Sequence, residues 1–168
     1  QWKKKLGLDS STLFHIHWKK NFEIGQQRPL PHLLKKIEIV QSIPGVGPVT
    51  AQAVLIVTKG FTKFKDARQF ACHCGVAPFE NSSGKLKGRT KVSKMANKKL
   101  KSLLHICALN AVRVEGELKK YYERKVKEKK SKMLVLNAIR NKIIQRIFAC
   151  IQKEEFYQKN YQFNLKKP

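Results

Sequence analysis

The chain has 168 residues, and its 36 lysines and arginines against 11 aspartates and glutamates give a formal net charge of +25. Hydrophobic residues make up 42% of the sequence, which is enough to fill a folded core beneath a basic shell and excludes a wholly disordered chain. A charge of this size favours a nucleic-acid partner over acidic small molecules and leaves a membrane surface as the rival. The membrane alternative requires a basic amphipathic helix with an aromatic face, and none dominates here.

The four cysteines and the hydropathy pattern bear on metal sites and membranes. Only Cys72 and Cys74 are close in sequence, and their C-x-C spacing around His73 is not that of a zinc finger or ribbon. We therefore expect reduced thiols in a cytoplasmic protein, and no metal site in this chain. No apolar run reaches the roughly 18 residues of a transmembrane helix, so we expect no membrane insertion. Because the chain starts at Gln1 rather than Met, we expect a piece of a longer protein.

Residues 1–36 are irregular, with aromatic and apolar residues interleaved with lysines. A short helix over residues 10–22 is compatible with them, and the two prolines of the run 28–31 end whatever precedes it. We expect a basic and aromatic arm that grips DNA or a partner, or the end of a linker helix packed on the core.

Residues 37–57 predict two helical segments joined by the hairpin Pro44-Gly45-Val46-Gly47-Pro48, which is the pattern of a helix-hairpin-helix motif. Gly45 and Gly47 allow tight backbone geometry, and Val46 can plug between the helices. Free N–H groups at the start of the second helix, near Thr50, can bind a phosphate without reading base sequence. The rival interpretation is a hairpin that only packs helices together or dimerises the chain.

Apolar residues at helical spacing predict four further helical stretches, over residues 66–74, 94–114, 117–132 and 131–152. We see no alternating strand pattern, repeat or heptad run. The sequence therefore predicts a mainly α fold, a compact helical domain over residues 37–152 that contains the helix-hairpin-helix motif. Residues 153–168 are left as an irregular tail.

The most basic loop of the chain lies over residues 81–94, and it begins as a flexible turn with Ser82, Ser83 and Gly84. A positive charge then occupies nearly every second position, at Lys85, Lys87, Arg89, Lys91 and Lys94. Because a loop gains no stability from concentrated like charge, we expect a polyanion to lie across it, with a nucleic-acid backbone as the first candidate. The two hydroxyl groups then sit where a phosphate would be.

The predicted helix after this loop carries Lys98, Lys99 and Lys101 near its start. Cations at a helix N-terminus oppose the helix dipole, so this placement does not serve stability. It is a second indication that the loop and the helix start face phosphates. We count Asn97, Lys98 and Lys101 among the candidate nucleic-acid-binding residues.

Several motifs follow one another in a fixed order across residues 37–151. They are Ser42-Ile43-Pro44-Gly45-Val46-Gly47-Pro48-Val49-Thr50-Ala51, then Phe61-x-x-Phe64-x-x-Ala67-x-Gln69-Phe70, Gly75-Val76-x-Pro78, Ser83-Gly84, Lys94 with Asn97, Leu100 and Leu103, and Tyr121-Tyr122. In this order they resemble the C-terminal domain of the DEDD-type insertion-sequence transposases, the group named for insertion sequence 110.

The resemblance implies a recombinase that cuts and rejoins DNA, in which the serine of the Ser-Gly motif attacks a strand and forms a phosphoserine link. That role falls on Ser83, with Ser82 as the alternative. It also implies a separate N-terminal RuvC-like domain whose acidic residues bind a divalent metal, Mg²⁺. A homo-oligomer, a guide RNA in some members, and a place at the bacterial nucleoid are further implications.

The chemistry implied for Ser83 needs supporting groups, because a serine hydroxyl is a poor nucleophile without a base or nearby cations. The basic residues of the loop can supply the cations, and Arg89 adds a bidentate fork. The chain departs from the resemblance at Ala96, where the family has glycine, and at Lys101, where it has arginine. The acidic residues form no evident metal cluster, so we expect the fragment alone not to complete recombination.

Composition, hairpin and basic loop also fit a second interpretation. In it the chain is a non-catalytic helix-hairpin-helix module that grips DNA or structured RNA, such as a decayed or isolated transposase fragment. Only the context of Ser83-Gly84 and the ordered motifs favour the recombinase.

Overall fold

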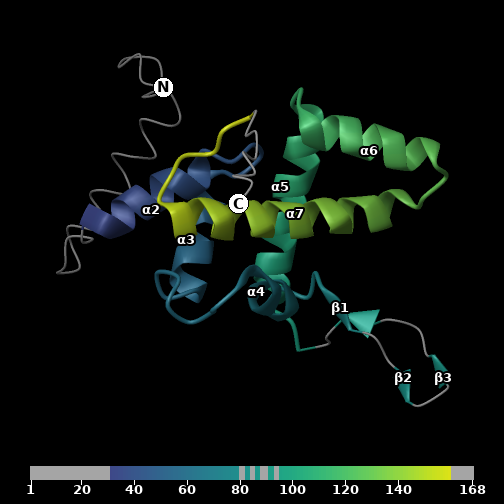
Figure 1. Cartoon of the computed structure of the whole chain (residues 1–168), viewed down its shortest axis with the longest axis horizontal. Helices are drawn as coiled ribbons and strands as arrows, with labels where there is room; N and C mark the ends of the chain where they lie inside the picture. The colour runs from purple at the N-terminus through teal and green to yellow at the C-terminus, as the bar shows by residue number, and fades with distance from the viewer. Residues whose placement is uncertain (1–30, 80–81, 84–85, 88–90, 93–94, 160–168) are drawn as a thin grey trace, which may run out of the picture. The chain divides into compact units, whose positions relative to one another are not determined.

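The computed structural model of the chain describes residues 31–79, 82–83, 86–87, 91–92 and 95–159. Lys35–Pro168 form one compact unit and Gln1–Leu34 another. The predictions for residues 1–30 and for the end of the tail lie outside the described residues. The described helices, seen in Figure 1, are α2 Pro31–Gln41, α3 Pro48–Val57, α4 Ala67–His73, α5 Lys98–Arg113, α6 Glu117–Lys127 and α7 Lys132–Lys153. The prediction of a mainly α fold is confirmed.

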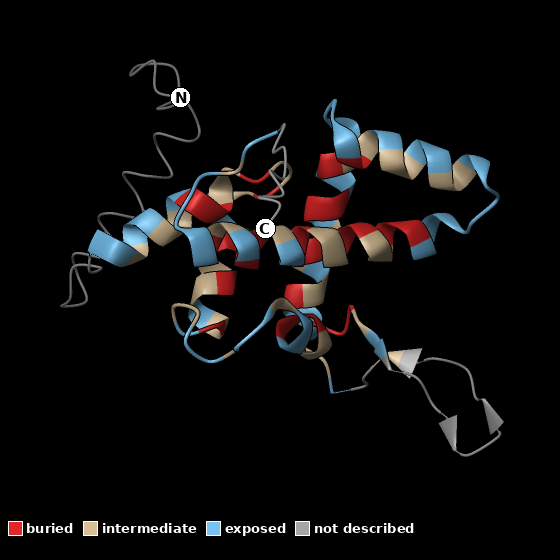
Figure 2. Cartoon of the chain, viewed as in Figure 1, coloured by how far each residue is buried: buried red, intermediate tan, exposed pale blue. Residues whose placement is uncertain are grey.

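Helix α7 is the element against which α4, α5 and α6 all pack. Its apolar side meets the apolar side of α5, and Figure 2 shows the buried residues in red along both helices. Ile139 and Ile143 of α7 and Leu104 of α5 are fully buried. Burial of one such side chain stabilises the fold by roughly 1.5–3 kcal/mol, so this helix pair is the main source of stability.

Side-chain caps define where α4 and α5 begin. Asp66 accepts a hydrogen bond from the backbone N–H of Gln69 at 2.8 Å, and this confirms the helix predicted over residues 66–74. The carboxamide oxygen of Asn97 accepts from the N–H of Leu100 at 3.1 Å, so α5 begins at Lys98. The predicted start at residue 94 is wrong, because Asn97 has the extended backbone (φ −67°, ψ 97°) of a capping residue.

The start of the C-terminal tail is part of the compact unit. Helix α7 ends at Lys153, where Glu154 adopts a left-handed conformation with φ 54°. The backbone N–H of Tyr157 then donates to Oγ of Ser42 at 2.9 Å, and its ring packs on the core. Ser42 in turn donates to the carbonyl of Ile39 at 2.6 Å. These bonds tie the tail to the hairpin after α2.

Residues 78–92 form what we call the arm, which holds four two-residue strands. Strand β1 (Pro78–Phe79) pairs antiparallel with β4 (Lys91–Val92), and β2 (Ser82–Ser83) pairs antiparallel with β3 (Leu86–Lys87). The sequence shows no alternating strand pattern over these residues. Two-residue strands are too short for the alternation of side chains to be read from sequence.

Candidate nucleic-acid interface and serine arm

The hairpin between α2 and α3 packs directly on α5 through Gly45. This glycine has φ +88°, and a Cβ placed on it would lie 2.5 Å from the carbonyl oxygen of Cys107 and 2.8 Å from Cβ of Ala111. Only glycine fits such a position. Val46 is buried at 8% exposure, as its predicted role between the helices requires.

Thr50 and Gly47 differ in how far they are buried. The Thr50 side chain is 5% exposed, and the thiol of Cys107 donates to its Oγ1 at 3.3 Å. The Thr50 hydroxyl therefore serves the core, and a phosphate contact through that hydroxyl is not available in this structure. By contrast, a Cβ on Gly47 would meet nothing within 4 Å.

The N-terminus of α3 carries no side-chain cap. Gly47 is its N-cap residue with φ −94° and ψ 170°, and Pro48 occupies the first turn. The next side chain, that of Val49, is 52% exposed. An uncapped and accessible helix N-terminus presents backbone N–H groups and the positive end of the helix dipole, which is a setting for anion binding.

The residues on either side of the arm are hydrogen-bonded to the helical body. The carboxamide nitrogen of Asn137 on α7 donates to the carbonyl of Val76 at 2.9 Å, just before β1. On the return side, the N–H of Asn97 donates to the carbonyl of His73 at 3.0 Å. Both ends of the arm are therefore fixed to packed helices.

The predicted catalytic serines lie in the arm. The backbone register pairs Ser82 with Lys87 and Ser83 with Leu86. Lys91 lies in β4 opposite Phe79. Three other predicted binding residues, Lys85, Arg89 and Lys94, lie outside the described residues.

Three predicted residues meet at the start of α5. Asn97 uses its carboxamide oxygen as the helix cap, so that oxygen is engaged within the protein. Lys98 is exposed and Lys101 is half-buried. The hairpin contacts α5 at Cys107, ten residues beyond Asn97, which corresponds to roughly 15 Å along a helix. The predicted residues thus form two groups along α5, one at the arm and one at the hairpin.

The sequence analysis missed a buried basic pair between α5 and α7. Arg140 is 4% exposed, and its Nη2 lies 3.1 Å from Nδ1 of His105. Burial lowers the pKa of Arg140 from its usual value, and burial together with the Arg140 charge lowers the pKa of His105. The signal available in the sequence was an arginine within the apolar stripe of α7.

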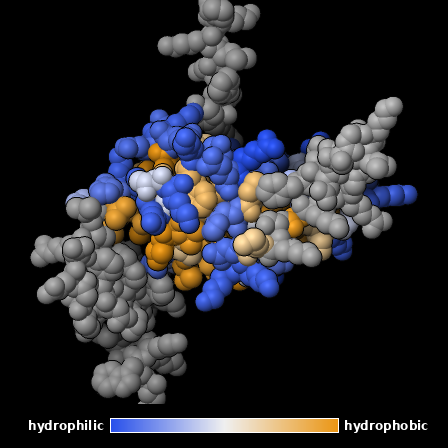
Figure 3. All heavy atoms as spheres, turned by 90° about the horizontal axis from the view of Figure 1, so that it is seen from below, coloured by the Kyte–Doolittle hydropathy of each residue, from blue (hydrophilic) through white to orange (hydrophobic). Residues whose placement is uncertain are grey.

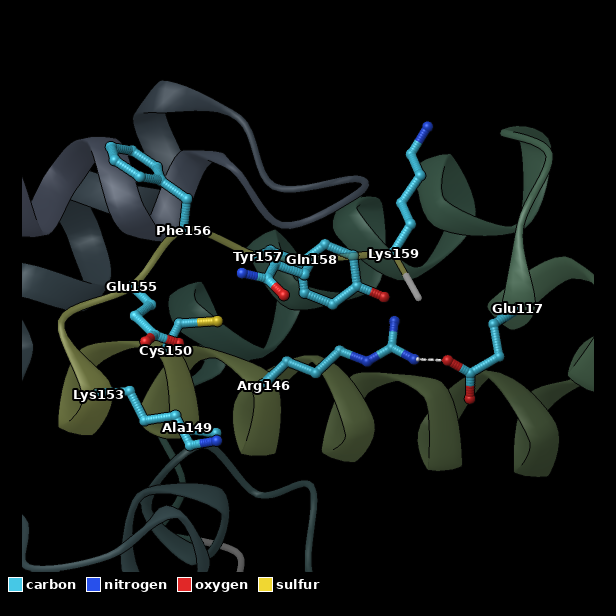
Figure 4. Close-up of a pocket in the computed structure, with 10 residues that line it drawn as sticks. All are labelled: Glu117, Arg146, Ala149, Cys150, Lys153, Glu155, Phe156, Tyr157, Gln158 and Lys159. Carbon is cyan, nitrogen blue, oxygen red and sulfur yellow. Dashed lines mark hydrogen bonds and ion pairs between the residues drawn. The ribbon is translucent and has the colours of Figure 1, made fainter. Parts of the chain in front are cut away.

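A second missed feature is a cavity of about 320 Å³ between α7 and the tail, shown in Figure 4. The guanidinium of Arg146 points toward the carboxylate of Glu117 and forms an ion pair with it. The same guanidinium lies 5.2 Å from the centre of the Tyr157 ring. Because its walls carry charges of both signs, this cavity does not attract a polyanion as the arm does.

The described surface is mainly hydrophilic. Figure 3 shows hydrophilic residues in blue over most of the coloured atoms on the face seen from below, with apolar residues in orange between them. Exposed apolar side chains include Ile56 of α3 at 74% and Ile106 of α5 at 54%. Among the described helices, none is both long and apolar enough to cross a membrane.

Within the described part of the chain, no three histidine, cysteine, aspartate or glutamate residues lie close enough together to hold a metal ion. The described residues therefore offer no site for a divalent metal, which the resemblance places in a separate domain.

Residues 37–123, just over half of the chain, match the Transposase IS116/IS110/IS902 family. The match includes the hairpin, the arm and α5, and all of the predicted site residues lie within it. The chain belongs to this family, and the resemblance drawn from the ordered motifs is confirmed.

Three relatives illustrate the match. The uncharacterized 44.8 kDa protein of insertion element IS116 from Streptomyces clavuligerus is 31% identical over 90 residues, which cover 54% of this chain and 23% of that protein. The transposase for insertion sequence element IS1111A from Coxiella burnetii is 30% identical over 122 residues, 71% of this chain and 34% of that protein. The pilin gene-inverting protein of Moraxella lacunata is 24% identical over 131 residues, 77% of this chain and 41% of that protein. The chain thus matches less than half of the length of each of these relatives.

Proposed function

We propose that this chain is the part of a transposase that holds DNA and supplies the serine nucleophile for cutting and rejoining strands. Family membership supports the general role in transposition. The observation that carries the finer proposal is the arm, where Ser82 and Ser83 lie within a basic stretch whose flanking residues, Val76 and Asn97, are hydrogen-bonded to α7 and α4. A nucleophile must be held in place relative to its substrate, and anchored ends serve that purpose.

In each step of the proposed reaction, one bond to phosphorus forms as another breaks. Serine Oγ attacks a phosphorus of the DNA backbone, and an Oγ–P bond forms as the bond from phosphorus to a nucleotide oxygen breaks. The hydroxyl proton passes to a base, and the released oxygen takes up a proton. Attack by another strand end on the phosphoserine reverses these changes, so rejoining needs no separate energy source. The lysines and Arg89 of the arm stabilise the charge that develops on the phosphate oxygens.

The hairpin supplies the second half of the proposed interface. The uncapped N-terminus of α3 binds a backbone phosphate through its N–H groups, while the +25 charge of the chain draws the polyanion to the surface. Contacts of this kind fix the register of the DNA and do not read its sequence. Sequence choice is therefore assigned to another part of the machinery, which includes a guide RNA in our proposal.

The rest of the proposed machinery lies in a longer protein. Because the chain matches less than half of each relative, an acidic domain that binds Mg²⁺ and the assembly into a homo-oligomer are proposals about that longer protein. We propose that the fragment alone binds DNA and does not complete recombination. We also propose a cytoplasmic protein at the bacterial nucleoid.

The alternative is a non-catalytic module that binds DNA or structured RNA. The hairpin favours it, because an uncapped helix N-terminus and a basic surface bind phosphates whether or not a serine reacts. The two functions differ only in what the serines do.

Substitution of the serines in the full-length protein separates the two functions. Ser83→Ala, Ser82→Ala and the double variant are compared for the formation of a denaturation-resistant protein–DNA adduct and for strand joining at the ends of the element. We expect Ser83→Ala to abolish both while DNA affinity stays within about twofold, since the hydroxyl adds no charge for counterion release. Ser102→Ala is the matched control, because Ser102 is an exposed serine of α5 that donates only to the carbonyl of Lys98. Recombination by the double variant would establish the non-catalytic module instead.

A further inference from the structure

The guanidinium of Arg140 is the least satisfied polar group among the described residues. Its Nε is buried without a hydrogen-bond partner there, and its one polar neighbour is Nδ1 of His105 at 3.1 Å. None of the ion pairs between described residues includes it. Among the described residues, Arg140 is a buried cation with one imidazole acceptor and no carboxylate partner.

The helices that carry this pair supply only positive charge. Neither α5 nor α7 contains an aspartate or glutamate. Lys101 stands one turn before His105 on α5 and is half-buried. Helix α4, which also packs on α7, adds Arg68 and His73. Helix α6 packs on both helices and carries Glu117 and Glu123, but none of the described ion pairs joins either glutamate to Arg140. A buried cation without a paired anion is unfavourable unless an anion joins it.

The pair is close to the base of the arm. Asn137, one turn before Arg140 on α7, is the residue that donates to the carbonyl of Val76. Val76 is two residues before β1, where the arm begins. An anion at Arg140 is therefore about one helical turn, or roughly 5 Å along α7, from the residue that holds the arm.

We propose that Arg140, His105 and Lys101 form an anion site at the base of the arm, and that its ligand is a backbone phosphate of the nucleic acid. The inference rests on the proposed DNA binding and not on the serine chemistry. It adds a third phosphate position to those of the arm and the hairpin.

The geometry of the guanidinium defines how the phosphate is held. Nε and Nη2 of an arginine donate from the same edge in a fixed fork, and this edge matches two oxygens of a phosphate. In this structure Nη2 lies 3.1 Å from Nδ1 of His105, while Nε has no hydrogen-bond partner among the described residues. His105 is half-buried, so a change of its rotamer opens the edge to an entering oxygen.

The charge of the surroundings favours phosphate over a carboxylate as the ligand. A carboxylate side chain neutralises one cation, whereas a nucleic acid brings a series of charges that also reach Lys101 and the arm. The site is thus matched to a polyanion that continues beyond it.

Substitution of Arg140 in the 168-residue chain tests the site. We expect Arg140→Met to keep or raise the thermal unfolding midpoint, because it removes a buried unpaired charge and keeps an unbranched apolar stem in its place. We expect it to weaken binding to a DNA duplex roughly tenfold or more, the usual worth of a charge-assisted hydrogen bond. Arg140→Lys keeps the charge and loses the fork, so it should restore binding only in part.

Lys142→Met is the matched control, because it removes one charge from the same helix. Its ammonium lies 4.8 Å from the centre of the Tyr121 ring on α6. It should weaken binding by less than about fivefold, as expected for a surface charge. Equal losses for the two variants would overturn the proposal, as would a large fall in the unfolding midpoint of Arg140→Met without a loss of affinity.

Nuclear magnetic resonance provides a direct readout that does not require DNA. Titration with inorganic phosphate at constant ionic strength should shift the Nε–H signal of Arg140 and raise the pKa of His105, because an anion reverses the effect of the Arg140 charge. If the chain failed to bind DNA, this titration would still report on the site. A shift with acetate and none with phosphate would mean a carboxylate ligand and overturn the proposal, and no shift with either would also overturn it.

Discussion

The helical body and the arm differ in what holds them together. The body is built on fully buried side chains such as Leu104, Ile139 and Ile143. The arm is held by backbone pairing of two-residue strands and by hydrogen bonds at its two ends. The body therefore carries the stability of the protein, and the residues proposed to react lie in a segment that adds little to it. Changes in the body should therefore lower stability, whereas changes in the arm should mainly weaken DNA binding. Four predictions test this, ordered from the largest expected effect on the free energy of unfolding to the smallest.

Gly45→Ala should have the largest effect. The new Cβ would lie 2.5 Å from the carbonyl oxygen of Cys107 at a backbone with φ +88°, so both overlap and strain arise. We expect the free energy of unfolding to fall by about 3 kcal/mol or more in denaturant titrations. Gly47→Ala is the control, since nothing lies within 4 Å of its Cβ. It should cost less than about 1 kcal/mol through the weaker helix cap, and equal costs would contradict the packing role of Gly45.

Alkaline pH should weaken the body through Cys74. Burial raises the pKa of this thiol from 9.0 to about 12. Below pH 9.0 the thiol is protonated in both the folded and the unfolded chain, and its contribution to the free energy of unfolding is fully present. As the pH rises from 9.0 toward 12, the unfolded chain releases the proton while the folded chain keeps it, so this contribution is lost. We expect a loss of about 2 kcal/mol between pH 9 and pH 10.5 in the free energy of unfolding. Cys74→Ala should show a correspondingly flatter alkaline slope, and an unchanged slope would refute the assignment.

Asn97→Ala should have a moderate effect, because it removes the cap of α5. We expect a fall of about 1 kcal/mol in the free energy of unfolding. Asn97→Asp keeps the accepting oxygen and should retain most of the stability. If Asn97→Ala left stability unchanged and only weakened DNA binding, the main role of Asn97 would be to bind DNA and not to cap α5.

Neutralising the arm should have the smallest effect on stability. Replacement of Lys87, Arg89 and Lys91 by glutamine should change the free energy of unfolding by less than about 0.5 kcal/mol. The slope of log affinity against log salt concentration should fall by about 0.9 for each duplex phosphate contact that is lost, similarly for all sequences. The same replacement at Lys127, Lys129 and Lys130, between α6 and α7, is the matched control. Weakening confined to one DNA sequence would indicate base contacts in the arm.

The sequence predicted the body well where a local pattern and burial agree. Asp66 followed by apolar residues marked α4, and the spacing of Ile139, Ile143 and Ile147 marked α7. The family followed from ordered motifs that extend over the same region. These features depend on neighbours in sequence, which is why they can be read without a structure.

The sequence did not predict features that depend on distant partners. Thr50 was predicted to lie where backbone N–H groups bind a phosphate, and the contact of its hydroxyl with Cys107, more than fifty residues away, was not foreseen. The sequence analysis did not single out Arg140, because its partner His105 lies on another helix, 35 residues earlier in the chain. The bond from Tyr157 to Ser42 likewise joins the two ends of the described region. The candidate serines were proposed from their local context and the ordered motifs, and their role stays a prediction.

The bond from Asn97 to the carbonyl of His73 closes the body beneath the arm. Because this bond joins α4 to the start of α5, we expect these helices to keep their packing when the length of the arm changes. A longer segment in its place costs little, since each doubling of a loop adds only about 0.6 kcal/mol of closure entropy. Such an architecture is open to engineering: a reactive segment of another length or chemistry can be exchanged for this one while the helices beneath it keep their packing.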